Sequence, residues 1–137
     1  MPMITWDESY SVGVKELDDQ HKKIIEIIDR LYLLISENKN IETEIPKILS
    51  ELAEYADRHF SSEEIYFREF DYDKAESHIQ IHNEYRERVK EFRHDFEAGK
   101  GGEVLADLSD FVNGWWVWHI NHTDKEYTQC FHDHGLY

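Results

Sequence analysis

Apolar residues recur at alternating spacings of three and four along most of the chain, which is typical of helices that bury one face. The pattern predicts four helices, over about residues 18–38, 41–70, 74–98 and 103–129. The stripe of the first helix consists of Leu17, His21, Ile24, Ile28, Leu31 and Ile35. Residues 1–17 lack a clear period and predict an N-terminal arm, after which Asp18 or Asp19 can cap the first helix.

Short polar or glycine-rich segments separate the predicted helices, and Pro46 is tolerable because it falls near the first turn of the second one. Short connections place consecutive helices antiparallel to each other. The sequence therefore predicts an all-α fold, an up-down-up-down antiparallel four-helix bundle that forms a single domain over residues 1–137. Residues 130–137 are expected to form a short C-terminal tail.

Composition narrows the function classes. The formal charge of −15 disfavours nucleic acid and anionic membrane surfaces as partners, because both carry negative charge themselves. No apolar run approaches the roughly 18 residues of a membrane span, and the first residues lack the pattern of a signal peptide. Cys130 is the single cysteine, so no internal disulfide can form. These features predict a cytoplasmic protein.

Polar residues lie in the middle of the apolar stripe on every predicted helix. They are His21, His59, Glu63, His78, His82 and His119. An unpaired polar group costs about 1–3 kcal/mol to bury, and a domain with about 5–15 kcal/mol of net stability cannot carry so many without compensation. Imidazole and carboxylate are good ligands for first-row metals, so a shared metal centre is the hypothesis that explains the pattern.

The spacing of these residues supports a shared centre, with one irregular position. His59 and Glu63 are four residues apart, and so are His78 and His82, which places each pair on one helical face. Asp124 follows His119 by five residues, about 140° away on an ideal helix. We therefore expect local widening of the helix, such as a π-bulge, if Asp124 is a ligand. His122 lies on the predicted stripe and is a competing ligand.

The chain resembles the hemerythrin family, specifically its bacterial single-domain members, over residues 6 to about 128. The resemblance rests on four segments: Asp19-Gln20-His21-Lys22, His59-Phe60-Ser61-Ser62-Glu63-Glu64, His78-Ile79-Gln80-Ile81-His82 and His119-Ile120-Asn121-His122-Thr123-Asp124. A single pair of histidines would be weak evidence. Seven residues that match the family's ligands, in the family's order and distributed over four helices, are much more specific evidence.

The resemblance implies two non-haem iron ions joined by an oxo or hydroxo bridge. One iron would take His78, His82 and His119, the other His21 and His59, and Glu63 and Asp124 would bridge them. One coordination position would stay open on the iron with two histidines. The residues matching the family's oxygen pocket are Ile24, Trp115, Trp116 and Ile120.

The implied function is reversible dioxygen binding for storage, transport or delivery by a monomer that is not an enzyme. Dioxygen is the implied ligand, and an oxygen-using enzyme is a further candidate partner. The alternatives are a di-iron oxidase or peroxidase, an iron-storage protein, and a sensor of oxygen or nitric oxide. Ferritin-like di-iron sites use two ExxH motifs, whereas this chain offers one, ending at His94. A zinc protein is disfavoured because HExxH is absent.

The C-terminal residues Cys130, His132 and His134 also include metal-binding types. Their spacing matches no known metal motif, and we expect a loose, solvated tail with a free thiol.

Overall fold

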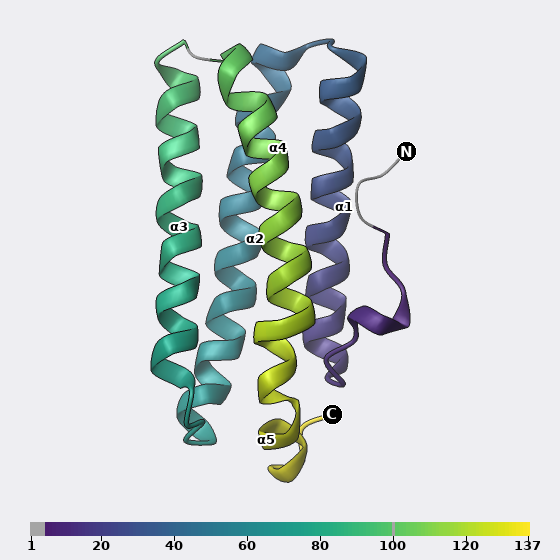
Figure 1. The fold of residues 1–137 in the computed structure, drawn as a ribbon, viewed down its shortest axis with the longest axis vertical. Coiled ribbons are helices and arrows are strands. Elements are labelled where there is room, and N and C mark those ends of the chain that lie inside the picture. The colour runs from purple at the N-terminus through teal and green to yellow at the C-terminus, as the bar shows by residue number, and fades with distance from the viewer. Residues whose placement is uncertain (1–4, 100) are drawn as a thin grey trace.

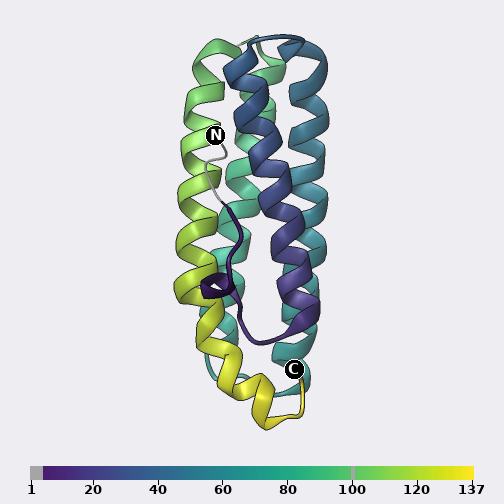
Figure 2. The same cartoon turned by 90° about the vertical axis from the view of Figure 1, so that its right-hand side faces the viewer.

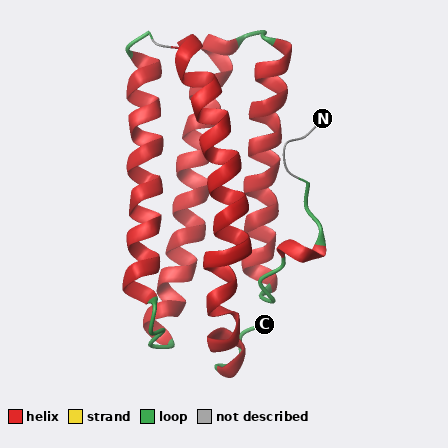
Figure 3. Ribbon diagram, in the orientation of Figure 1, coloured by secondary structure: helices red, strands yellow, loops and turns green. Residues whose placement is uncertain are grey.

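A computed structural model describes residues 5–99 and 101–137 and confirms the four-helix bundle. The long helices are α1 (Lys15–Glu37), α2 (Ile41–Glu69), α3 (Ala75–Glu97) and α4 (Gly101–Trp118). They run alternately up and down, side by side, as Figure 1 shows. Figure 3 shows helices and loops and no strand in the described part of the chain.

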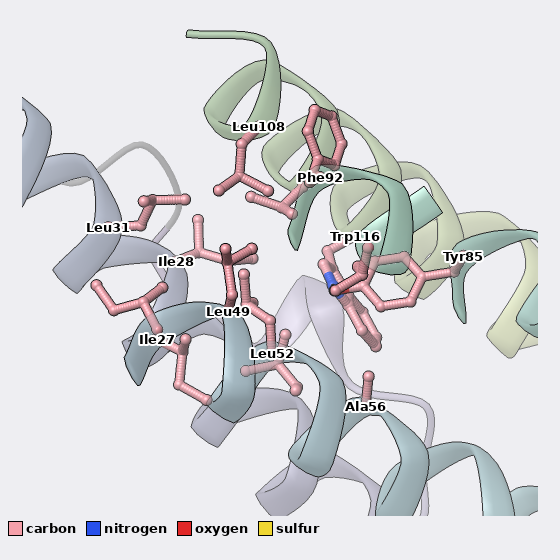
Figure 4. Packing of buried hydrophobic residues seen from close by; sticks show 14 of the residues in the cluster. Ile27, Ile28, Leu31, Leu49, Leu52, Ala56, Tyr85, Phe92, Leu108 and Trp116 are labelled. Carbon is pink, nitrogen blue, oxygen red and sulfur yellow. The ribbon is translucent and has the colours of Figure 1, made fainter. Parts of the chain in front are cut away.

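Each long helix packs against the next one in the sequence, and α4 closes the ring against α1. The predicted stripes form the interior of this ring. Figure 4 shows Leu31, Leu49 and Leu108, which come from three different helices, together in one apolar core. No helix in the described ranges is both long enough and apolar enough to cross a membrane.

The buried apolar residues form two clusters at different heights in the bundle. The larger cluster includes Ile24 and Phe60, and the smaller one includes Leu17 and Phe67. In the sequence of α1, His21 lies between Leu17 and Ile24. In α2, Glu63 lies between Phe60 and Phe67. The polar residues of the predicted site therefore form a layer between two apolar clusters.

The start of α1 differs from the prediction. The helix begins at Lys15, and neither Asp18 nor Asp19 caps it. The carboxylate of Asp18 instead accepts hydrogen bonds from the backbone N–H of Val12 at 2.8 Å and from the Ser11 hydroxyl at 2.6 Å. Asp18 thus fixes the arm to the first turn of the helix. The prediction was wrong because a carboxylate can satisfy backbone donors of the preceding segment as well as those of its own helix.

The C-terminal segment is also more ordered than predicted. After α4 come a π-helical turn η2 (His119–Thr123), a 3-10 turn η3 (Asp124–Tyr127) and α5 (Thr128–Asp133). Phe131 is fully buried in the smaller cluster, and His132 Nε2 lies 2.8 Å from the carbonyl oxygen of Gly13. His134 stacks on Phe70 with ring centroids 4.5 Å apart. The loose, solvated tail was therefore a wrong prediction.

The N-terminal arm, with a short 3-10 helix η1 (Glu8–Tyr10), lies along the bundle between α1 and α4 (Figure 2). Its last residues, Val12 and Val14, are buried in the same cluster as Phe131. The arm and α5 together cover the end of the bundle below the polar layer.

Candidate metal centre

Seven histidine and carboxylate side chains from all four sides of the bundle meet in the polar layer. Each is at most 2% exposed, and they are His21, His59, Glu63, His78, His82, His119 and Asp124. These are the seven residues that the family resemblance implied as metal ligands. One histidine comes from α1, one histidine and a glutamate from α2, two histidines from α3, and the remaining pair from η2 and η3.

The seven side chains form two sets that could each hold a metal ion, with the ligand atoms of each set within 4.8 Å of one another. One set contains three histidines: His78, His82 and His119. The other contains two: His21 and His59. Glu63 and Asp124 belong to both sets. The geometry thus separates the histidines in the way that the family resemblance implied, while their individual roles as iron ligands stay a prediction.

Asp124 connects the two sets through its two oxygens. Oδ1 lies 3.0 Å from His78 Nε2 and 2.9 Å from His119 Nε2. Oδ2 lies 2.8 Å from His21 Nε2 and 3.6 Å from His59 Nε2. A carboxylate with one oxygen toward each set is placed to bridge two cations.

Glu63 faces the same centre from α2. Its Oε1 lies 3.3 Å from His59 Nε2 and 3.2 Å from His82 Nε2, but neither carboxylate oxygen has a hydrogen-bond partner among the described residues. Asp124 Oδ1 and His82 Nε2 are also buried without a hydrogen bond of acceptable geometry among the described residues. Polar atoms left unpaired in a core cost about 1–3 kcal/mol each. Coordination to a metal removes that cost, so this donor set fits metal ions of the first transition row.

The backbone widens where Asp124 needs it. Residues His119–Thr123 form a π-helical turn, which holds more residues per turn than an α-helix. The expected widening is therefore confirmed. Asp124 is fully buried, whereas His122 is exposed and stacks on Trp118 with ring centroids 3.8 Å apart. The structure turns His122 away from the centre, so the competing ligand is excluded.

The electrostatics of the layer favour a bound cation. Burial lowers the pKa of His59 to about 3, so this imidazole is neutral near pH 7, as a metal ligand must be. Burial and the nearby charge of Asp124 raise the pKa of Glu63. Burial would also raise the pKa of Asp124, but contact with His119 and other imidazoles holds it well below its usual value. Burial beside Asp124 thus disfavours the ionised form of Glu63. A cation bound between the two carboxylates would stabilise the ionised form of both.

Three of the four predicted pocket residues, Ile24, Trp116 and Ile120, are fully buried beside the layer. The Trp116 ring centroid lies 5.9 Å from that of His59, 6.5 Å from that of His21 and 6.0 Å from that of His119, so this ring borders both sets. Trp115 differs from this group.

The half-buried ring of Trp115 stacks on His119 at 4.2 Å, on the side of the three-histidine set. The sequence predicts an apolar stripe of Leu105, Leu108, Val112, Trp115 and His119 on the fourth helix, and the structure confirms it at Leu108, Val112 and His119, which are buried. Val104 and Trp116 are buried, and Leu105 and Trp115 are only half-buried. The sequence does not decide which of the two adjacent tryptophans is fully buried, because either side chain can fill the apolar core.

Two residues that hydrogen-bond to the outer nitrogen of a predicted ligand were missed by sequence reasoning. Gln20 Oε1 lies 2.7 Å from His59 Nδ1, and Glu64 Oε2 lies 2.8 Å from His82 Nδ1. Both are sequence neighbours of predicted ligands but lie outside the apolar stripes. Their adjacency to His21 and Glu63 was the one available signal, and it does not reveal which histidine each residue reaches.

A four-helix bundle whose core holds two histidine sets joined by shared carboxylates is a non-haem metal protein. A comparison with protein families adds the particular family: the hemerythrin HHE cation binding domain matches residues 12–130. The chain belongs to the hemerythrin family.

Relatives and solved structures agree with this assignment. The chain is 31% identical to a bacteriohemerythrin of Clostridium acetobutylicum over 130 residues, which cover 91% of this chain and 98% of the relative. It is also 31% identical to a bacteriohemerythrin of Methylococcus capsulatus, with 95% and 98% covered. A crystal structure of wild-type hemerythrin superposes with a TM-score of 0.83 at 31% identity, with 93% of this chain and 96% of that chain covered.

Proposed function

We propose that this protein binds dioxygen reversibly at a centre of two iron ions held by the seven buried side chains. The observation that carries the proposal is the division of the ligands into a three-histidine set and a two-histidine set that share Glu63 and Asp124. Two irons bound there would supply the electrons and the free coordination position that reversible dioxygen binding requires.

The unequal sets support a place for one small ligand. With Glu63 and Asp124 shared, the set of His21 and His59 offers one side chain fewer than the other set. A metal with fewer protein ligands keeps a coordination position open. The fully buried Trp116 lies near His59 of this set, with ring centroids 5.9 Å apart, and would lie beside the metal held there.

The apolar residues beside this set would keep water out. Ile24, Trp116 and Ile120 offer no charged group to the space around His21 and His59, and Trp116 Nε1–H donates to the Tyr85 hydroxyl at 3.0 Å. Because its one polar atom is already paired, the indole presents an apolar ring to the site. A dry pocket admits an apolar gas and excludes the water that promotes irreversible oxidation.

The ligand composition supports a carrier over an oxidase. Five imidazoles and two carboxylates would hold the centre, whereas ferritin-like di-iron proteins use carboxylate-rich ligation with paired ExxH motifs. Fewer anionic ligands stabilise high oxidation states less. We therefore propose that the protein is a dioxygen carrier and not an enzyme. The strongly acidic composition, with a charge of −15, fits a protein kept monodisperse by self-repulsion, and we propose that it is cytoplasmic.

The test is a spectroscopic cycle on the purified protein. The protein is reduced without oxygen, air is admitted, and the visible spectrum is recorded with an iron assay. We expect two irons per chain and a charge-transfer band that appears with oxygen and disappears when oxygen is removed. Immediate, irreversible oxidation, or steady consumption of a reductant with oxygen, would support the oxidase alternative and overturn the carrier proposal.

A further inference from the structure

His82 of the three-histidine set is supported by a carboxylate. Its Nδ1 lies 2.8 Å from Glu64 Oε2, and the side chain of Glu64 is only 13% exposed. Arg86 holds that carboxylate in place by donating from Nη1 at 3.2 Å and bonds at the same time to Asp57 at 3.1 Å. On the other side, the His82 ring stacks on Phe60 with centroids 3.9 Å apart. Both the plane and the tautomer of this imidazole are therefore fixed.

His59 of the two-histidine set is supported by a neutral amide. The Ser62 hydroxyl donates to the Arg58 carbonyl oxygen at 3.0 Å, so its oxygen accepts from Gln20 Nε2 at 3.1 Å. This orients the Gln20 amide with its oxygen toward His59 Nδ1, 2.7 Å away. The His59 Nδ1–H therefore donates to a neutral oxygen, and Nε2 faces the centre.

The two supports differ in their effect on the imidazole. A carboxylate that accepts from Nδ1–H increases the electron density at Nε2 and makes it a stronger metal ligand than a neutral amide does. The stronger support, Glu64, lies on the set that already has one more histidine. Among the remaining ligands, the buried Nδ1 atoms of His21 and His119 have no hydrogen-bond partner in the described part of the chain. Glu64 and Gln20 are thus one hydrogen-bonding support for each set, and they differ in charge.

We propose that Glu64 and Gln20 are positioning residues that set the order of metal loading, with the three-histidine set filled first and held more tightly. The inference rests on the metal centre of the proposed function but not on dioxygen binding. The set of His78, His82 and His119 would form a stable single-metal protein, and the set of His21 and His59 would gain and lose its metal more readily.

The test is a titration of the metal-free protein with Co²⁺ alone, against a competing chelator, followed by visible absorbance. We expect two binding steps at least tenfold apart. Glu64→Gln keeps an oxygen near His82 but removes the charge, and should weaken the tighter step by about 10- to 100-fold while leaving the weaker step unchanged. Gln20→Glu should strengthen the weaker step by about tenfold. The double variant, with Glu64→Gln and Gln20→Glu together, should make the affinities of the two steps similar or reverse the order of loading.

Glu54→Gln is the matched control. It removes the same charge from the same helix, at an exposed side chain that pairs with Arg58 and contacts no predicted ligand. We expect both steps to be unchanged in this variant. Equal weakening of both steps in Glu64→Gln, or no change in either, would overturn the inference, and so would a weaker second step in Gln20→Glu with intact helicity by circular dichroism.

The outcomes separate this inference from the proposed function. If Co²⁺ loading follows the predicted order but the iron protein does not bind dioxygen reversibly, the carrier proposal fails and the loading order stands. If dioxygen binds reversibly but Co²⁺ loads both sets in one step, the carrier proposal stands and the loading order is wrong.

Discussion

Each carboxylate oxygen of Asp124 faces a different pair of histidines, at distances between 2.8 and 3.6 Å. No other residue of the layer contacts both sets with separate atoms in this way, as far as the described residues show. The neighbouring His122 has the same metal-binding chemistry but is exposed and bonded to the Trp118 carbonyl at 3.1 Å. The two residues therefore make a matched pair for mutation.

Asp124→Ala should lower the metal content of the purified protein to one ion per chain or less, because both sets lose a ligand atom. His122→Ala should leave two ions per chain, because its ring does not reach the centre. Elemental analysis of both variants after identical loading provides the measurement. Normal metal content in Asp124→Ala, with loss in His122→Ala, would reverse the assignment of this ligand.

Ile24 follows His21 by one turn of α1 and is fully buried. Ile24→Ala should preserve dioxygen binding but speed the irreversible oxidation of the iron, because a cavity beside the two-histidine set admits water. Leu31→Ala is the control, since Leu31 is equally buried on the same helix but about 10 Å further along it, away from His21. Each variant should cost about 2–5 kcal/mol of stability. Equal oxidation rates in the two variants, followed by absorbance in air, would show that Ile24 does not shield the site.

Six of the seven residues of the centre could be predicted because they interrupt apolar stripes, where a polar side chain is costly without a partner. His21, His59 and His82 stand out for that reason. Asp124 lies off the stripe of an ideal helix and was predicted from the family resemblance, and a π-helical turn brings it into the layer. The supports Gln20 and Glu64 could not be predicted, because a hydrogen bond to Nδ1 depends on how far each helix is rotated about its axis. The same ambiguity affected Trp115, which was grouped with Trp116 but is only half-buried and stacks on His119 alone of the ligand histidines.

At the scale of the elements, the helices themselves were predictable and their ends were less so. The bounds of α2, Ile41–Glu69, match the predicted range of 41–70 closely, because its apolar stripe is long and ends at a polar turn. The C-terminal region was predicted less well. A π-helical turn and a 3-10 turn follow each other there, and no periodic pattern continues through such a change of winding.

Phe131 shows what the last element contributes. It is fully buried on α5, with its ring 4.3 Å from Tyr127 and 5.9 Å from Phe67, centroid to centroid. It therefore joins the C-terminal segment to the cluster that lies directly beneath the polar layer. An ordered last helix follows from this packing and not from local propensity alone.

Phe131→Ala should lower the free energy of unfolding by about 3–5 kcal/mol, because it leaves a cavity in the smaller apolar cluster. Gln129→Ala, at an exposed position of the same helix, should change it by less than about 0.5 kcal/mol. Urea denaturation of both metal-free variants measures the difference. If the two variants unfold at the same urea concentration as the unmodified protein, α5 does not stabilise the bundle.

At the scale of the whole molecule, the polar layer divides the core and leaves buried oxygens of Glu63 and Asp124 without hydrogen-bond partners among the described residues. The metal-free folded protein bears the free-energy cost of burying these unpaired oxygens, whereas the metal-loaded protein does not. A ligand that binds the folded state and not the unfolded one adds stability in proportion to the logarithm of its excess over Kd. The stability of the bundle should therefore depend on its metal.

Removal of the metal by a chelator should lower the Tm by roughly 5–10 °C relative to protein with metal at about a hundredfold excess over Kd, where binding adds about 2.7 kcal/mol. Helicity at low temperature should change little, because the apolar clusters above and below the layer remain packed. Melting curves by circular dichroism, with and without metal, provide the measurement. An unchanged Tm would mean that the layer does not hold a metal in the folded state.

The most direct test of the two-metal centre is an anomalous difference map from crystals of the iron-loaded protein, recorded at the iron absorption edge. We expect two peaks inside the bundle, one beside His78, His82 and His119 and the other beside His21 and His59, with Glu63 and Asp124 between them. A single peak, no peak, or peaks outside this layer would contradict the assignment of the site and the dioxygen-binding function built on it.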